Sequence, residues 1–499
     1  MKKQITLGAI LSYLSIGLSI VSGLIYTPWM VAQIGQSNYG LYTLANSLIN
    51  MFLVDFGLSA ATARFLSKYN AEGDQEKANQ FMGVVYKLYL LIDAIIFVAL
   101  IVIYFFIDAI YVKLTPDEIS RFKIVYIISS LYAVIHFPFV TQNGVLTSYE
   151  KIIQLKLADI LYRVFLVGGT IFAILQGWGL YALVCANAVA GLLSVLYKYI
   201  VIAKCTPVKA DFKASGKDVY QSLLSFSAWT TVSSLAQRLI FGIIPSVLGI
   251  VSNSAEIAIF GIITTIEGYF YLVTSAINGI FMPKIARIYS GTDHETDIMP
   301  LMTRVGKFQF FLNGLLVIGF AVAGQDFITL WMGPNYSAAY LGTLLVIFPS
   351  MFMNALQIAN TAMIVQNKIR ARALIDLGTG LLNVILAFVF TRWYGALGGG
   401  ISVAIAYSVR AILYHIAHVK IMKIDIPLFM KRCYLRFLPT FAITLLAGWG
   451  LNLLWTTVNW GVLIVKIIIL CVLFAGTAFA LALTKQERAG ILSIVKRKK

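Results

Sequence analysis

Residues 223–251 read LLSFSAWTTVSSLAQRLIFGIIPSVLGIV, a mostly apolar stretch that decides the fold. A helix of this length more than crosses the hydrocarbon core of a bilayer, which is about 30 Å thick. Arg238 lies inside the stretch, where a charge costs roughly 2.5 to 3.5 kcal/mol on insertion scales. Such residues usually face a bundle interior or a water-filled cavity. The stretch therefore predicts a membrane helix with a charged group turned inward.

Similar apolar runs recur along the whole chain of 499 residues, of which 60% are hydrophobic and 12% are charged. This composition indicates a polytopic membrane protein. We expect an all-α integral membrane protein with about fourteen transmembrane helices. The predicted spans are residues 7–34, 39–63, 81–107, 124–147, 152–175, 178–202, 223–251, 255–283, 308–331, 338–365, 373–391, 396–419, 437–456 and 460–483.

The positive charges predict the orientation of the chain. If the N-terminus is cytoplasmic, only four of the 39 Lys and Arg residues fall in exterior loops: Lys113, Arg121, Lys123 and Arg392. Most of the others border the cytoplasmic side, as the positive-inside rule requires. We therefore expect both termini in the cytoplasm. The net charge of +18 is then largely a topology signal, and we expect no nucleic-acid partner.

The sequence also indicates an internal duplication. Pro28 corresponds to Pro245 and Asp159 to Asp376, in both cases 217 positions apart. Because each copy has six spans, we expect two parallel six-helix lobes related by a pseudo-twofold axis along the membrane normal. The predicted domains are an N-terminal lobe (1–205), a cytoplasmic linker (206–222), a C-terminal lobe (223–423), two additional transmembrane helices (424–484) and a basic cytoplasmic tail (485–499).

Two segments carry a resemblance to a known family: FLVDFGLSAATARFLSKYNAEGDQEKANQF at residues 52–81 and TSYEKIIQLKLADILYRV at residues 147–164. They are similar to bacterial polysaccharide flippases of the multidrug/oligosaccharidyl-lipid/polysaccharide exporter superfamily, which implies a location in the inner or plasma membrane of a bacterial cell. The resemblance implies a secondary transporter that moves a polyprenyl-diphosphate-linked oligosaccharide from the inner to the outer leaflet by alternating access, for surface polysaccharide biosynthesis. Membrane lipids, a coupling proton or sodium ion and other polysaccharide assembly proteins are the further partners to consider.

A diphosphate headgroup with sugars requires a wet, cationic cavity. Arg238 is the first candidate, because arginine can bind phosphate oxygens in a bidentate way, and Gln237 beside it could bind sugar hydroxyls. Arg163 and Arg410 are the other candidates for this cavity. Two structural alternatives remain open: Arg238 could pair with a carboxylate on a neighbouring helix, and Arg163 could pair with Asp159 one turn earlier.

Acidic residues inside the predicted spans form a second set. A carboxylate that is unpaired in one state could carry the coupling proton or sodium ion, and Glu267 is the first choice. The full set of candidates is Asp55, Asp93, Asp159, Glu267 and Asp376. Pro28 and Pro245 are expected to act as kinks during gating, because each removes a helical hydrogen bond. Lys466 is expected to snorkel to the outer interface.

Three other functions compete with this prediction. A lipid II flippase would need a similar cationic cavity, whereas a multidrug exporter would favour a more acidic or apolar pocket than three intramembrane arginines provide. A membrane enzyme that polymerises or ligates lipid-linked glycans would need catalytic groups in a sizeable exterior loop, and the longest such loop, 108–123, has no catalytic cluster. There is no Walker A sequence, and the four cysteines have no metal-ligand spacing. We therefore predict a transporter without catalytic residues, metal or cofactor.

Overall fold

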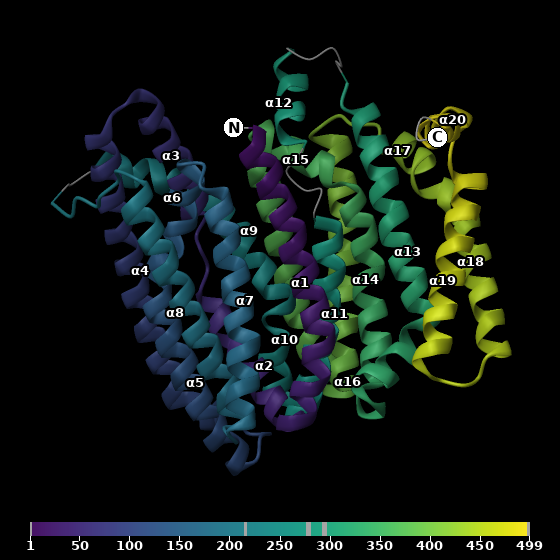
Figure 1. Ribbon diagram of the computed structural model, residues 1–499, viewed down its shortest axis with the longest axis horizontal. Helices are drawn as coiled ribbons and strands as arrows, with labels where there is room; N and C mark the ends of the chain where they lie inside the picture. Colours follow the sequence, from purple (N-terminus) through teal and green to yellow (C-terminus); the bar gives the residue numbers. More distant parts are fainter. Residues whose placement is uncertain (1, 214–216, 276–280, 292–296, 497–499) are drawn as a thin grey trace. The chain divides into compact units, whose positions relative to one another are not determined.

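The computed structural model describes residues 2–213, 217–275, 281–291 and 297–496, and over these ranges the regular structure is helical (Figure 1). Helices suit a bilayer because they satisfy every backbone hydrogen bond internally. Eleven of the described helices are long and apolar enough to cross a membrane, and one bent pair adds a twelfth span. The chain is thus a multi-pass, all-α membrane protein.

The first predicted repeat contains eight helices. They are α1 (Lys2–Ile34), α2 (Gln36–Phe52), α3 (Leu58–Glu72), α4 (Gln75–Ile110), α5 (Pro116–His136), α6 (Gln142–Ser148), α7 (Ile152–Leu175) and α8 (Leu180–Cys205), with a 3-10 turn, Phe137–Thr141, between α5 and α6. The predicted span 152–175 coincides with α7. The predicted span 39–63 is not one continuous helix, because residues 53–57 separate α2 from α3.

The rest of the chain contains α9 to α20. The helices are α9 (Lys217–Phe241), α10 (Ile244–Val251), α11 (Ser254–Ser275), α12 (Met282–Ser290), α13 (Met299–Met332), α14 (Ala338–Ala355), α15 (Gln357–Val365), α16 (Ile369–Lys420), α17 (Ile426–Arg432), α18 (Tyr434–Leu454), α19 (Trp460–Thr477) and α20 (Lys485–Lys496). The predicted span 223–251 is divided into α9 and α10, which meet at 40°. α9 begins inside the predicted linker, and α20 lies in the predicted tail.

Backbone geometry supports the internal repeat. Glu150 and Asn367, 217 positions apart, have φ angles of 55° and 57°, a region that non-glycine residues seldom adopt. Gly179 and Gly395 both have φ 53°, with ψ −128° and −132°. Each glycine precedes a membrane helix, and Gly395 divides the 52 residues of α16 into the two spans that were predicted there. The same unusual conformations at nearly the same offset indicate duplication.

Contacts divide the chain into two compact units. Unit 1 comprises Met1–Gly261 and Asp376–Gly398, and unit 2 comprises Ile262–Ile375 and Gly399–Lys499. Within unit 1, α7 packs along α8 and α1, and α2 packs against α5. Within unit 2, α13 packs against α14, α18 and α19 (Figure 1). The units do not follow the predicted lobe boundaries, so the two lobes stay a prediction.

An ion pair fastens the C-terminal helix α20 to unit 2. Lys307 Nζ in α13 lies 2.7 Å from Glu487 Oε1. The backbone N–H and the hydroxyl of Thr484 donate to the other carboxylate oxygen. Burial alone would raise the pKa of Glu487, but the hydrogen bonds from Lys307 and Thr484 outweigh it and hold that pKa below its usual range.

We expect α20 to loosen from α13 in acid. The stabilisation by Glu487 is fully present above the ordinary carboxyl pKa of about 4.3 and is lost as the pH falls through the lower folded value. A spin label on the exposed position 486 (Gln486→Cys) should therefore gain mobility between about pH 5 and pH 3. In Glu487→Gln the label should be mobile across this range. A pH-dependent change that persists in Glu487→Gln would contradict the assignment.

Candidate functional site

The second membrane segment is interrupted at residues 53–57, which leave the helical path between α2 and α3. Phe56 and Gly57 have φ angles of 52° and 68°, which glycine adopts freely and phenylalanine only rarely. An interruption leaves backbone carbonyls without helical partners. At membrane depth such backbone is tolerated where it is buried in protein or lines a water-filled cavity, so the break is a candidate site.

Two side chains of α9 bind the exposed carbonyls of this break. Thr231 Oγ1 donates to Phe56 O at 3.0 Å, and Arg238 Nη2 donates to Leu53 O at 3.3 Å. The two donors are seven positions apart and therefore lie on one face of α9, which packs against α2 and α3. Arg238 is half-buried. Its bond to Leu53 is the one hydrogen bond it makes to another described residue, so the rest of its guanidinium fork can bind a ligand.

One carboxyl group lies within the break, and a second lies on α4, which packs against α3. Asp55 Oδ1 accepts hydrogen bonds from Tyr89 Oη at 2.5 Å and from Ser59 Oγ at 3.2 Å. Asp93 lies one turn after Tyr89 on the same face of α4 and is buried. Its Oδ1 has no hydrogen-bond partner in the part of the chain that the structure describes. Because a charge is costly in a membrane segment, Asp93 is a candidate carrier of a proton or cation.

A second interruption, between α9 and α10, follows one turn after Arg238. Pro245 in the first turn of α10 has no N–H to donate, and neighbouring helices supply the missing donors. Asn383 Nδ2 donates to two carbonyls at the end of α9, at 2.9 and 3.0 Å, and Ser47 Oγ donates to Gly242 O. Pro245 thus lies at a helix break, whereas Pro28 lies inside the continuous helix α1. Their role in gating stays a prediction.

Arg163 joins α7 to α1. Its Nε donates to Ser22 Oγ and its Nη2 donates to Ser19 O, both at 3.0 Å. The alternative in which Arg163 pairs with Asp159 is wrong, because Asp159 Oδ2 accepts from Lys156 Nζ at 3.1 Å. A flexible lysine one turn earlier reaches this carboxylate, while the arginine turns to the neighbouring helix. The predicted role of Arg163 in a cationic cavity stays a prediction.

Two predicted site residues belong to unit 2. Arg410 is fully buried in α16, with its guanidinium carbon 5.4 Å from the ring centre of Tyr407, a cation–π distance. Glu267 is half-buried in α11 and makes no hydrogen bond or ion pair with another described residue. Since Arg163 and Arg238 belong to unit 1, a cavity shared by the three arginines stays a prediction.

The sequence-based prediction missed the uncharged polar side chains at the two breaks, which are Ser47, Ser59, Tyr89, Thr231 and Asn383. A signal for the first break was present, since Asp55 and Gly57 are turn-forming residues inside an apolar run. Isolated Ser, Thr and Asn residues in apolar runs give no comparable signal. Of the remaining predicted residues, Gln237 is exposed on α9 and Asp376 is buried in α16.

A polar cluster ties α2, α5 and α11 together at their N-terminal ends. Glu118 Oε1 accepts hydrogen bonds from Ser37 Oγ at 2.6 Å and from Ser254 Oγ, which also donates to Ser37 at 3.1 Å. Ser37 and Ser254 are 217 positions apart and are therefore equivalent in the repeat. The other carboxylate oxygen of Glu118 caps α5 through Thr115. A single carboxylate thus links equivalent positions of the two repeats.

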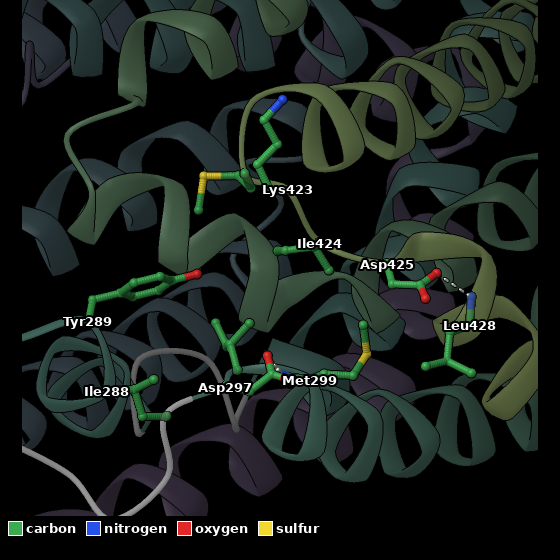
Figure 2. Close-up of a pocket in the computed structure, with 10 residues that line it drawn as sticks. Ile288, Tyr289, Asp297, Met299, Lys423, Ile424, Asp425 and Leu428 are labelled. Carbon is green, nitrogen blue, oxygen red and sulfur yellow. Dashed lines mark hydrogen bonds between the residues drawn. The ribbon is translucent and has the colours of Figure 1, made fainter. Parts of the chain in front are cut away.

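A pocket of about 370 Å³ in unit 2 lies beside the starts of α13 and α17 (Figure 2). Its charged lining residues are Asp297, Lys423 and Asp425. Asp297 accepts from the backbone N–H of Met299, and Asp425 accepts from that of Leu428 (Figure 2). Asp425 therefore caps α17, and Asp297 binds the first backbone N–H of α13. No group of three or more metal-ligating residues occurs among the described residues.

A second pocket of unit 2 is apolar. A groove of about 350 Å³ lies between α11, α13 and α19. Its walls are aromatic and aliphatic, with Phe270, Leu316 and Phe320 among them, and they expose no polar surface. A groove of this kind suits a hydrocarbon chain.

The sequence matches a known protein family. The sequence matches the family model described as polysaccharide biosynthesis protein over residues 5–288. It is 25% identical over 430 residues, or 80% of either chain, to the uncharacterized membrane protein EpsK of Bacillus subtilis (strain 168).

Two solved structures are similar in fold. The lipid II flippase MurJ in its inward closed conformation has a TM-score of 0.74 at 15% identity and covers 94% of this chain and 98% of its own. An inward-facing multidrug resistance MATE family transporter of the MOP superfamily has a TM-score of 0.64 at 14% identity, with coverages of 81% and 96%. The structural likeness defines the fold, and the family model matches more than half of the sequence. The chain belongs to the polysaccharide biosynthesis protein family.

Proposed function

We propose that the chain is a flippase for polyprenyl-diphosphate-linked oligosaccharide repeat units, which it moves from the cytoplasmic to the outer leaflet by alternating access for surface polysaccharide biosynthesis. The observation that carries this proposal is Arg238 at the helix break. There a guanidinium that gives one hydrogen bond to the other described residues meets interrupted backbone in a membrane segment. Arginine matches phosphate oxygens in geometry and charge. The family supports a polysaccharide precursor as the cargo.

The apolar groove of unit 2 supports a lipid-linked cargo. A polyprenyl chain gains roughly 0.8 kcal/mol for each methylene-sized group that leaves water, and a groove without polar lining costs it no unpaired hydrogen bond. We propose that this groove holds part of the polyprenyl tail. Gln237, exposed on α9, is the proposed contact for the sugars, and Arg163 and Arg410 are further proposed contacts for the diphosphate.

We propose a cytoplasmic location for both termini, which places the Glu118 cluster at the outer side. In this orientation the cluster acts as a closed outer gate, because it joins equivalent positions of the two repeats. Asp93 and Glu267, which lack described partners, are the proposed carriers of a coupling proton or sodium ion, and Asp55, Asp159 and Asp376 are weaker candidates since each is engaged by neighbours. Other polysaccharide assembly proteins are proposed partners.

Replacement of Glu118 by alanine should open the outer gate. The two serines would keep only their mutual hydrogen bond, and charge-assisted bonds of this kind contribute about 1.5 to 3 kcal/mol each. We expect a cysteine at Thr43 in α2 to react at least several-fold faster with a membrane-impermeant maleimide added outside. Asp117→Ala is the matched control, because it removes the neighbouring carboxylate, which pairs with Arg121 instead. Equal labelling in both variants would refute the gate.

Reconstituted transport tests the proposed function. Proteoliposomes would receive a polyprenyl-diphosphate oligosaccharide with a labelled sugar, and appearance of the label at the opposite leaflet would be followed with an impermeant sugar-modifying enzyme. We expect the wild-type chain to accelerate this step over protein-free vesicles. Movement of lipid II alone would favour the lipid II flippase, uptake of a cationic dye alone would favour the drug exporter, and a lengthened glycan without translocation would favour the enzyme.

A further inference from the structure

We propose that the corner between α17 and α18 is a binding site for the phosphate headgroup of an anionic phospholipid. A groove of about 500 Å³ lies on this corner and is lined by Leu428, Lys431, Arg432, Leu435 and Arg436. Three of the five lining residues are cations. The groove is separate from the proposed cationic site in unit 1, and its proposed occupant is a resident lipid.

The three cations of the groove have no partner among the residues that the structure describes. Lys431, Arg432 and Arg436 are exposed, and none forms an ion pair or donates a side-chain hydrogen bond to another described residue. The acidic residue nearest in sequence is Asp425, whose carboxylate caps the first turn of α17 through Leu428 N. The groove therefore carries a local charge of +3 that no described residue neutralises.

The corner that presents these cations is held in place by aromatic packing. Tyr434 packs on Phe310 with ring centres 4.7 Å apart and ring planes tilted by 31°, and it packs edge-on against Phe352 and Phe429. Its hydroxyl donates to Phe352 O at 3.2 Å. Phe429 and Cys433 are fully buried. The buried side of the corner is thus fixed on unit 2, so the backbone that carries the three cations is already in place and loses little further entropy when an anion binds.

The surroundings of the groove select a lipid rather than a soluble anion. The corner opens the membrane span Ile426–Leu454, so the cations lie where that span meets the headgroup region. Leu435 and Leu438, 56% and 53% exposed, continue from the groove along α18. A headgroup phosphate can contact the cations while an acyl chain follows these leucines. With the proposed orientation, this is the cytoplasmic leaflet, where anionic lipids attract basic segments.

Native mass spectrometry of the purified full-length chain, titrated with phosphatidylglycerol or phosphatidylcholine, tests the proposal. We expect wild type to prefer phosphatidylglycerol and the triple variant Lys431→Ala/Arg432→Ala/Arg436→Ala to bind it roughly a hundredfold more weakly. The matched control is Lys204→Ala/Lys209→Ala/Lys213→Ala, which removes three exposed charges from the linker region and should retain the affinity. If the triple variant does not fold, Arg432→Gln and Arg436→Gln singly should each weaken binding about fivefold.

Three outcomes would overturn the proposal. The first is equal affinity of wild type and the triple variant for phosphatidylglycerol. The second is an equal loss of affinity in the linker control, which would show that binding depends on the net charge of the chain and not on this groove. The third is displacement of the lipid by inorganic phosphate or by a polyprenyl diphosphate at equal concentration, which would assign the groove to a soluble anion or to the transported cargo. Because this readout is binding of phospholipid, it stands or falls separately from transport.

Discussion

Arg238→Ala should lower the transport of a polyprenyl-diphosphate oligosaccharide in proteoliposomes by about ten- to a hundredfold. Charge-assisted hydrogen bonds contribute about 1.5 to 3 kcal/mol each, and the guanidinium has donors left after its bond to Leu53 O. Arg238→Lys should recover part of the rate, since it keeps the charge but loses the planar fork. Arg392→Ala removes an exposed arginine of unit 1 and should leave the rate unchanged.

The protein level and thermal unfolding of each variant provide the control for this transport experiment. Loss of one charge-assisted hydrogen bond to a backbone carbonyl should lower the free energy of unfolding by about 1.5 to 3 kcal/mol. This is less than the roughly 5 to 15 kcal/mol typical of folded proteins, so the Arg238 variants should remain folded. Full transport by both Arg238→Ala and Arg238→Lys would show that Arg238 does not bind the cargo and only stabilises the backbone at the helix break. Equal losses in Arg238→Ala and Arg392→Ala would show a general effect of net charge.

Removing one partner of the buried pair Lys466–Asp326 should have the largest effect on stability. Lys466 Nζ in α19 lies 2.9 Å from Asp326 Oδ2 in α13 and 3.0 Å from Asn452 Oδ1 in α18, and its side chain is only 2% exposed. Asp326→Leu would leave a buried ammonium without its counter-charge, at a cost of about 3 to 5 kcal/mol. The measurement is the thermal unfolding transition in detergent.

The double variant Asp326→Leu/Lys466→Met separates the ion pair from simple packing. We expect it to recover most of the loss, because the buried charge is removed together with its partner. Lys123 and Asp108 form an exposed ion pair, and Lys123→Ala should cost at most about 1 kcal/mol. If Asp326→Leu alone were as stable as wild type, Lys466 would have to reach water.

The membrane character and the helix pattern could be predicted because a bilayer imposes length and hydropathy on every span. The kink at Pro245 and the duplication with its offset of 217 residues could also be predicted, because prolines and repeated motifs are visible in the sequence itself. The backbone angles of Glu150 and Asn367 agree with that duplication. The break in the second span was missed, because hydropathy averages over a turn such as the one at Asp55 and Gly57, whereas Pro245 did indicate the bend in the seventh span.

Side-chain partners could not be predicted, because they depend on how neighbouring helices are rotated. The prediction that Lys466 snorkels was wrong for this reason: its depth suited snorkelling, but α19 turns it toward Asp326. Asp159 similarly pairs with Lys156 rather than with Arg163. Nothing in the sequence indicated that Asn383 and Thr231 have a role. They become part of the candidate site because they donate hydrogen bonds to carbonyls at helix breaks.

The central claim is that Arg238 at the helix break binds the diphosphate of the cargo. The most direct measurement compares the affinities of a short-chain polyprenyl diphosphate sugar and of the matching polyprenyl glycoside without phosphate, for wild type, Arg238→Ala and Arg392→Ala in the same detergent. Wild type and Arg392→Ala should prefer the diphosphate by at least tenfold, and Arg238→Ala should lose most of this preference. An undiminished preference in a folded Arg238→Ala variant would contradict the claim.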